Sequence, residues 1–502
     1  MNSEPTSQSI TTLVAVQITA GLLLTAVAFP WVSPLSWGPN PDMLQHLATG
    51  GSVAVLLLAA ALGGHLLSRS ALVGTVAWGW LLAALLSAGM AVVQYFGVAD
   101  AAWSEWVMRT DIGTAYANLR QRNQFASLTS IGLLSLLWLA HRPPGATPLA
   151  LPALRTSALC VAVALLAVGN ACSSSRTGAL QWLLIAVLAW WWGRGEQRTA
   201  LRWSGLALGL YLVANLVLPL ALQALTGQVP ANALERFGED AGSQSRTVLW
   251  ANVIELTRVH PWLGWGWGEL KFAHFMHPYA GERFSVILDN AHNLPLHLAV
   301  ELGVPAALLL CGGALALALR AKPWQERQPT RQLAWGVLLV IALHSVLEYP
   351  LWYGPFQVAA VLAICMLCSE RLLQWRGLRL AACAVAGVLI AMTAYTGWDY
   401  ARVSQLYLPP QFRAERWKEN TYDKVKDSVL FRNSVQFAYV TTTPVTPETA
   451  RALYTASWQV LHYSPEPKVI AVLLESAALL NLESPLTEHI RRQWRVAYPE
   501  GY

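Results

Sequence analysis

Residues 1–397 alternate long apolar runs with short polar breaks, whereas residues 398–502 mix polar and apolar positions as water-soluble proteins do. A hydrocarbon core about 30 Å thick is crossed by about 20 apolar residues in a helix. Suitable segments occur at residues 10–30, 47–67, 71–95, 124–140, 156–172, 177–193, 203–224, 294–319, 332–350, 355–373 and 378–397. The pattern predicts an all-α polytopic membrane protein with about eleven transmembrane helices. It also predicts a transmembrane domain at 1–397, which includes the loop at 225–293, and a helical C-terminal domain at 398–502.

The first apolar segment has one feature of a signal peptide, because Ala26-Val27-Ala28 resembles a cleavage site. No Lys or Arg precedes it, however, and signal peptides begin with a positively charged region. We therefore expect this segment to be retained as a membrane anchor.

Basic residues are concentrated in alternate loops, with few acidic residues among them. They are Arg69, Arg142, Arg155, Arg194, Arg198, Arg202, Arg320, Lys322, Arg327, Arg331, Arg371, Arg376 and Arg379. The positive-inside rule places these loops in the cytoplasm. The opposite loops would then face the periplasm of a bacterial inner membrane, and they are residues 96–123, 173–177, 225–293, 348–355 and the tail.

The composition excludes an ordinary soluble protein, since 55% of residues are hydrophobic and 12% are charged, against about 25% charged in soluble domains. The net charge of +6 is explained by the cytoplasmic loops, so we expect no nucleic-acid binding. The six cysteines lie within or at the ends of apolar runs and form no readable disulfide or zinc framework.

Four arginines stand out because they lie beside apolar segments on the side opposite the basic loops: Arg120, Arg122, Arg176 and Arg246. Each alone is better explained as an interfacial anchor or a salt-bridge partner than as a functional residue. Together they indicate an anion near the outer leaflet.

The predicted periplasmic loop at 225–293 is far longer than a typical connection, and such loops are usually functional or disordered. It contains an amphipathic helical pattern that begins at Arg246 and a run of tryptophans and glycines at 262–268. Trp265 and Trp267 could form a platform for sugar stacking or part of an interfacial aromatic belt, and the pattern does not separate these two interpretations.

His292 precedes the eighth apolar segment, where Asn293 is a suitable N-cap and Pro295 is tolerated in the first turn. The positive end of the helix dipole disfavours imidazolium and attracts anions. A neutral histidine that can act as a base beside a phosphate is therefore one interpretation, and a histidine satisfied by local hydrogen bonds is the other.

Three further pairs of ionisable residues contain histidine. His297 with Glu301 and His344 with Glu348 are spaced i,i+4 and are expected to share helical faces, in a structural or a functional role. His274 and His277 form an H-x-x-H pattern without a suitably spaced acidic third ligand. We expect no metal site.

Three motifs resemble those of the O-antigen ligase superfamily. Ser173-Ser174-Ser175-Arg176-Thr177-Gly178 is similar to its Ser-Arg turn, and Arg246 is similar to the arginine that opens its periplasmic helix. Ala291-His292-Asn293 with Glu301-Leu302-Gly303 resembles its catalytic-loop motif. The motifs occur in the family's order and at the expected topological positions, and the resemblance covers most of the chain.

Within this superfamily, the chain resembles the bacterial protein O-oligosaccharyltransferases. Gln121-Arg122-Asn123-Gln124-Phe125-Ala126 and the segment from His344 to Tyr353 are similar to segments of that branch. The tail resembles its helical-repeat region, although only a pair of helices is expected, at 447–462 and from Pro465.

The resemblance implies a function, an inverting transfer of a glycan from undecaprenyl diphosphate to Ser or Thr hydroxyls of periplasmic proteins. His292 would be the general base, Arg176 and Arg246 the diphosphate clamps, and Arg122 an auxiliary. The expected substrate-binding residues are Arg122, Gln121, Asn123, Asn293, Glu348, Trp265 and Trp267. The partners implied are the lipid-linked oligosaccharide donor, periplasmic acceptor proteins and membrane lipids, with no cofactor and no metal.

Two other classes of function compete with this interpretation. A lipid A core ligase or an O-antigen polymerase would use the same donor with a sugar hydroxyl as the acceptor. A lipid-linked glycan transporter also needs polar residues in its helices, but internal repeats with broken helices, typical of transporters, are not visible. The sequence leaves the glycan, the acceptor and the oligomeric state open.

Overall fold

The computed structural model describes residues 7–35, 38–40, 42–99, 105–141, 156–193, 198–228, 245–368 and 376–499. Every regular element among them is a helix, which confirms the all-α class. The basic residues Arg142, Arg155, Arg194 and Arg371, and residues 229–244 of the long loop, lie outside the described residues.

The chain forms two compact units. Unit 1 comprises Met1–Ser36, Pro41–Glu239 and Ala321–Thr393, and unit 2 comprises Trp37–Asn40, Asp240–Arg320 and Ala394–Tyr502. The second unit therefore combines much of the long loop at 225–293 with the C-terminal region. The domain boundaries expected from the sequence stay a prediction.

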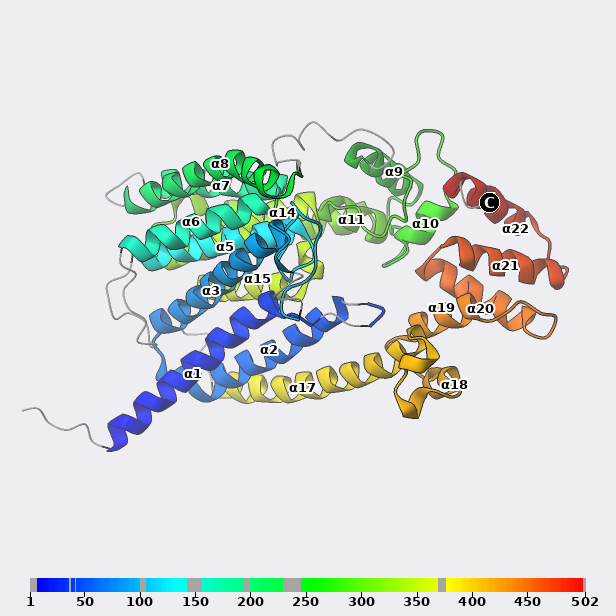
Figure 1. Ribbon diagram of the computed structural model, residues 1–502, viewed down its shortest axis with the longest axis horizontal. Helices are drawn as coiled ribbons and strands as arrows, with labels where there is room; N and C mark the ends of the chain where they lie inside the picture. The colour runs from blue at the N-terminus through cyan, green and yellow to red at the C-terminus, as the bar shows by residue number, and fades with distance from the viewer. Residues whose placement is uncertain are drawn as a thin grey trace, which may run out of the picture. The chain divides into compact units, whose positions relative to one another are not determined.

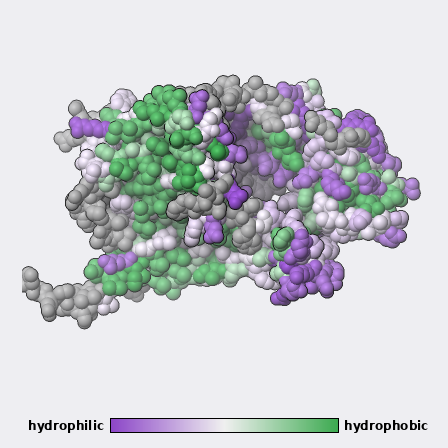
Figure 2. All heavy atoms as spheres, viewed as in Figure 1, coloured by the Kyte–Doolittle hydropathy of each residue, from purple (hydrophilic) through white to green (hydrophobic). Residues whose placement is uncertain are grey.

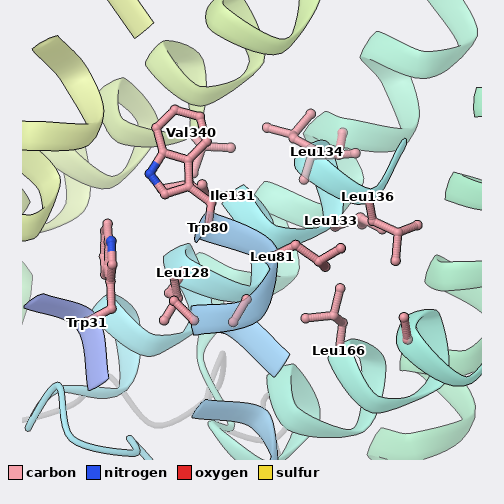
Figure 3. Close-up of a cluster of buried hydrophobic side chains, with 14 of the residues drawn as sticks. Trp31, Trp80, Leu81, Leu128, Ile131, Leu133, Leu134, Leu136, Leu166 and Val340 are labelled. Carbon is pink, nitrogen blue, oxygen red and sulfur yellow. The ribbon is translucent and has the colours of Figure 1, made fainter. Parts of the chain in front are cut away.

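Unit 1 is a bundle of long apolar helices. They are α1 (Ser7–Val32), α2 (Asp42–Gly63), α3 (Arg69–Tyr95), α5 (Arg122–Ala140), α6 (Thr156–Cys172), α7 (Arg176–Trp192), α8 (Arg198–Thr226), α14 (Pro329–Leu347), α15 (Gly354–Leu367) and the first part of α17 (Arg376–Ser404). Helix α5 lies in the interior, packed against α3, α6, α7 and α14 (Figure 1). Its buried Leu128, Ile131 and Leu134 belong to the same hydrophobic cluster as Trp80 and Val340 (Figure 3).

Small residues allow the helices around α3 to approach closely. A Cβ atom at Gly169 of α6 would lie 2.6 Å from the Cβ of Ala88 in α3, and one at Gly132 of α5 would collide with Ala84 of the same helix α3. Close backbone approach at small residues is a general feature of helix packing in membranes. The placement of alanine and glycine therefore sets which helices become neighbours of α3.

Eight helices are long and apolar enough to cross a membrane: Thr11–Val32, Asp42–Leu66, Arg69–Tyr95, Arg122–Ala140, Thr199–Thr226, Val304–Gln325, Pro329–Leu347 and Gly377–Tyr407. Helices α6 and α15 are shorter apolar helices. Leu212, Leu216 and Leu220 of α8 are exposed, and Figure 2 shows hydrophobic residues over much of the bundle's surface. The chain is thus a polytopic membrane protein, while the count of eleven crossings stays a prediction.

The predicted segment at 294–319 is not one continuous α-helix. Helix α11 (Leu294–Leu302) ends at Gly303, and the chain continues through α12 (Val304–Ala307), a π-helical turn (Leu308–Gly312) and α13 (Gly313–Ala321). Gly303 has a φ of 91°, a backbone conformation that interrupts the helix and favours glycine. The apolar run concealed this break, because hydropathy does not report backbone conformation.

Unit 2 contains α9 (Arg246–Val259), α10 (Leu270–Met276), α11 to α13, and the C-terminal helices α18 (Thr421–Val425), α19 (Arg432–Thr442), α20 (Ala450–Tyr463), α21 (Pro467–Leu479) and α22 (Pro485–Ala497). Successive helices of the series α19 to α22 pack against one another (Figure 1). The expectation of only a pair of helices in the tail was wrong. Helix α22 was missed because its sequence is strongly polar, although Ser484 and Thr487 form a capping box at its start.

Candidate active site

The first turn of α5 carries three of the predicted site residues. Gln121 caps the helix, because its side-chain oxygen accepts a hydrogen bond from the backbone N–H of Gln124 at 2.8 Å. Arg122 is the first helical residue and Asn123 the second, and both are half-buried. The preceding Arg120 instead forms a salt bridge, in which its guanidinium lies 3.2 Å from the carboxylate of Asp42.

The Ser-Arg turn connects α6 to α7. Ser174 adopts a φ of 48°, and Ser175 then caps α7 by accepting a hydrogen bond from Gly178 N at 3.0 Å. Arg176 is the first residue of that helix. The Ser175 hydroxyl also donates to Oδ1 of Asn123 at 2.6 Å, so the first turns of α5 and α7 are joined directly.

Glu348 completes this group. It is buried directly after α14, and its Oε1 accepts a hydrogen bond from Nδ2 of Asn123 at 3.1 Å. Asn123 therefore bridges the Ser-Arg turn and a buried carboxylate. Unit 1 thus joins the first turn of α5, which carries Gln121 and Arg122, to the residue before Arg176 and to Glu348. The roles of these residues in binding stay a prediction.

The expected helical pairing of His344 with Glu348 needs correction. Helix α14 ends at Leu347 and Glu348 has extended backbone angles, so the two side chains do not share a helical face. His344 Nδ1 instead lies 2.9 Å from the hydroxyl of Ser127, which accepts from Nε2 of Gln181 at 2.7 Å. This buried polar chain links α14, α5 and α7 in the bundle interior.

Unit 2 holds the other predicted catalytic residues. Ser245 caps α9 by accepting from Val248 N at 3.2 Å, and Arg246 is the first helical residue. One turn later, the indole N–H of Trp250 donates to the carbonyl of Ala291 at 3.0 Å. The start of α9 is thereby tied to the residue that precedes His292.

His292 lies in a tight turn immediately before α11. Asn293 is the N-cap, as predicted, and its side chain accepts from Leu296 N at 3.1 Å. His292 itself has a φ of 50°, in the left-handed region that non-glycine residues rarely adopt. The side-chain oxygen of Asn290 accepts from His292 N at 2.9 Å and supports this conformation.

The three predicted diphosphate ligands share one local structure. Arg122, Arg176 and Arg246 are each the first residue of a helix whose N-cap side chain is hydrogen-bonded. The positive end of a helix dipole and a guanidinium both attract anions. Arg69 also opens a helix, but its guanidinium donates to the carbonyls of Met366 and Cys368, so its position is explained by packing.

The tryptophan-glycine run wraps around the end of α11. Backbone hydrogen bonds join Trp265 N to Val300 O at 2.9 Å, Gly266 N to Glu301 O at 3.0 Å, and Val304 N to Pro261 O at 2.8 Å. At the crossing, a Cβ on Gly303 would collide with the carbonyl of Trp262, and one on Gly264 with that of Glu301. We refer to residues 260–268 with 300–304 as the clip.

The tryptophans of the clip differ in their surroundings. Trp265 is half-buried against the hydrophobic cluster around Leu256 and donates its indole N–H to the carbonyl of that residue at 2.9 Å. Trp267 is exposed, and its ring lies edge-on to His297 with centroids 6.1 Å apart. Trp262 is exposed beside the start of the apolar helix Val304–Gln325.

The H-x-x-H pair has hydrogen-bond partners within unit 2. His274 Nδ1 lies 2.8 Å from the hydroxyl of Tyr279, and its Nε2 lies 3.1 Å from the carbonyl of Phe284. Nε2 of His277 lies 2.8 Å from Glu255. Across the described part of the chain, no three His, Cys, Asp or Glu side chains are grouped as metal ligands would be.

Several residues that organise the site were not singled out from the sequence. Trp250, Asn290 and Gly264 act through single hydrogen bonds or close backbone contacts, which no spacing rule reports. The role of Ser175 could have been found, since a serine before a helical run is an N-cap signal.

Comparison with known families gives three matches along the chain. Residues 115–140 match protein glycosylation ligases, residues 161–311 match O-antigen ligases, and residues 332–502 match the C-terminal region of virulence factor membrane-bound polymerases. These segments contain the starts of α5, α7 and α9, together with His292 and Glu348.

One relative is a general O-oligosaccharyltransferase of Acinetobacter baylyi. It is 25% identical to this chain over 287 residues, which are 54% of the chain and 46% of the relative. The chain therefore spans less than half the length of that protein.

Proposed function

Because the chain belongs to the O-antigen ligase superfamily, in its protein O-oligosaccharyltransferase branch, we propose that it glycosylates proteins. It transfers an oligosaccharide en bloc from undecaprenyl diphosphate to Ser or Thr hydroxyls of periplasmic proteins. The active site faces the periplasm of a bacterial inner membrane.

The observation that carries this proposal is the repeated arginine at a capped helix start. A diphosphate leaving group carries negative charge that increases as the glycosidic bond breaks, and preorganised cations stabilise such a transition state. Arg176 and Arg246 hold the diphosphate, and Arg122, beside the Ser175–Asn123 hydrogen bond, assists them. Guanidinium groups suit this task because they pair with phosphate in a bidentate manner.

His292 is the general base. Its imidazole takes the proton of the acceptor hydroxyl, whose oxygen attacks the anomeric carbon as the bond to the diphosphate oxygen breaks. The products are the glycosylated protein and undecaprenyl diphosphate, with inversion at the anomeric carbon. The remaining proposed substrate contacts are Gln121, Asn123, Asn293, Glu348, Trp265 and Trp267, of which Trp267 is exposed for stacking on a sugar.

The proposed mechanism uses arginines for charge stabilisation and has no step that requires a divalent metal ion. Both ring nitrogens of His274 have close hydrogen-bonding neighbours within the protein, which supports this assignment. Transfer by the purified enzyme is expected to survive EDTA. Loss of activity that returns on adding a metal would overturn the assignment of the arginines.

The central experiment compares His292→Ala with the wild-type enzyme, using purified protein and lipid-linked donor. Removal of a general base typically slows a reaction about 10²- to 10⁴-fold. Donor binding should persist, because the base acts in the transition state. A folded His292→Ala enzyme with more than about a tenth of the wild-type rate would exclude His292 as the base.

A sugar acceptor defines the second candidate function, which the matches to O-antigen ligases and membrane-bound polymerases favour. Deletion of the gene distinguishes the two. Loss of periplasmic protein glycosylation with intact lipopolysaccharide supports the protein acceptor, whereas altered lipopolysaccharide with normal glycoproteins supports the sugar acceptor.

A further inference from the structure

The backbone around His292 is held from two sides. The carbonyl of Ala291 accepts from the indole N–H of Trp250 at 3.0 Å, and the N–H of Ala291 donates to Nδ1 of His297 at 3.4 Å. Both bonds act on the residue next to His292, whose φ of 50° costs conformational energy in a non-glycine residue. A strained turn of this kind persists only where its surroundings fix it.

His297 is suited to fix this turn because it is itself immobilised. It lies in α11 with a side chain that is 3% exposed, and its Nε2 is 3.4 Å from Oε2 of Glu301. The carboxylate of Glu301 also accepts hydrogen bonds from the backbone N–H groups of Gly268, at the end of the tryptophan-glycine run, and of Leu270, at the start of α10. His297 thus connects the turn at His292 to the clip.

The two contacts define the protonation state of His297. Nδ1 accepts from Ala291 N–H, so it carries no proton, and the ring proton is on Nε2, which faces Glu301. Burial and, to a smaller extent, the neighbouring His292 lower the pKa of His297 to about 4, so the ring is neutral at pH 7. A charged imidazolium would lose the Nδ1 acceptor.

We propose that His297 is a positioning residue, whose Nδ1 holds the peptide N–H of Ala291 and thereby sets the orientation of the His292 imidazole toward the acceptor hydroxyl. Glu301 keeps His297 in the required tautomer. This inference rests on the proposed role of His292 as the base. It assigns His297 no contact with substrate, and a misplacement of about 1 Å at a reacting group can cost about 10²-fold in rate.

Two substitutions of His297 test the roles of its two ring nitrogens separately. His297→Asn places an amide oxygen close to the position of Nδ1 and can still accept from Ala291, whereas His297→Gln places its amide close to Nε2 and keeps only the side toward Glu301. We expect His297→Asn to stay within about threefold of the wild-type kcat. We expect His297→Gln to lose about 10- to 100-fold in kcat, with donor KM unchanged. His65→Gln, at an exposed histidine of unit 1, is the matched control and should retain activity.

A second variant covers the case in which His297 substitutions prevent folding. Trp250→Phe removes the indole donor to Ala291 from the opposite side of the turn and keeps an aromatic ring, so it should lower kcat without changing donor KM. Equal activity of His297→Asn and His297→Gln, or a loss confined to donor KM, would overturn the inference.

The same variants in a His292→Ala background separate this inference from the proposed function. If His292 is the base and His297 positions it, His297→Gln causes no further loss there. If His292→Ala alone leaves activity intact, the base assignment fails. If His292→Ala abolishes transfer while His297→Gln is fully active, only the positioning role fails.

Discussion

The hydroxyl of Ser175 makes two hydrogen bonds: it donates to Oδ1 of Asn123 at 2.6 Å and accepts from Gly178 N at 3.0 Å. A single side chain therefore both starts α7 and holds the start of α5 beside it. Arg176 and Arg122 are the residues that follow these two caps in sequence.

We expect Ser175→Ala to lower both stability and activity. Loss of an N-cap costs about 1 kcal/mol, and loss of the Asn123 bond should lower kcat/KM about tenfold, equivalent to about 1.4 kcal/mol. Ser68→Ala is the matched control, because Ser68 caps α3 through Ala71 N at 3.2 Å and lies far from Asn123 in sequence. The temperature of thermal unfolding should fall for both variants, whereas the rate of glycan transfer should fall only for Ser175→Ala. If Ser175→Ala transfers glycan as fast as Ser68→Ala, the link to Asn123 has no role in activity.

Arg246→Ala is expected to weaken donor binding as well as slow transfer, because the diphosphate is present in both the ground and the transition state. Arg246→Lys should rescue only part of the loss, since the planar guanidinium fork is absent from lysine. Arg258→Ala makes the same charge change at the other, exposed end of α9 and serves as the control. Full rescue by lysine would indicate that a single positive charge is sufficient.

Gly303→Ala should destabilise unit 2. The backbone of Gly303, with φ 91° and ψ 158°, lies in a region almost confined to glycine, which costs about 1–3 kcal/mol for a residue with a Cβ. The new methyl group would also collide with the carbonyl of Trp262. Gly313→Ala in α13 has open space around it and should be neutral or stabilising, since alanine favours helices. Denaturation in detergent measures the stability of both variants. A Gly303→Ala protein as stable as the wild type would contradict the close backbone contact between Gly303 and Trp262 in the clip.

Stability should fall as the pH is lowered, in part through His274. Burial, aided by the charge of Arg283, lowers the pKa of His274 to about 3, whereas an exposed histidine titrates near 6.5. Between these values the unfolded state binds a proton that the folded state does not, so the free energy of unfolding decreases as pH falls from about 6.5 toward 3. The groups facing His274 include His277, Tyr279 and Arg283.

His274→Gln should reduce this pH dependence because the side chain no longer titrates. Thermal unfolding at pH 7.5 and pH 5 measures the effect, and a residual dependence from His297, whose pKa is also lowered, is expected. An unchanged difference between the two pH values would exclude His274 as a contributor.

The predicted topology can be tested with reporter fusions. A reporter after residue 325 should be cytoplasmic and one after residue 450 periplasmic, because the arginine distribution places the loop at 320–331 inside and the tail outside. A cytoplasmic signal at residue 450 would mean that a crossing was miscounted, and it would remove the tail from the side of the acceptor proteins.

Apolar runs were sufficient to predict the long helices, because about 20 consecutive apolar residues have few alternatives to a membrane helix. The break at Gly303 and the polar helix α22 were not predicted. The first depends on a close approach between Gly303 and Trp262, and the second is buried on one face only. Both depend on contacts with segments distant in sequence.

The candidate site shows a similar division. The N-cap at Asn293 was predicted from local sequence and is confirmed, because a cap is a contact between residues three apart. The bridge from Asn123 to Ser175 and Glu348 spans 52 and 225 residues, and no local rule predicts such pairs. Local sequence signals therefore predicted this cap, while the hydrogen bonds between distant residues required the structure, and the roles of the site residues stay predictions.

The arginines at the helix starts also link the stability of the fold to whether an anion is bound beside them. A cation at the positive end of a helix dipole is unfavourable by about 0.3–1 kcal/mol, so Arg122, Arg176 and Arg246 oppose the helices that they open. An anion bound beside them removes this repulsion, and a ligand present at 100 times its Kd stabilises the folded state by about 2.7 kcal/mol. If these arginines bind the diphosphate as proposed, resistance to unfolding is a direct measure of that binding.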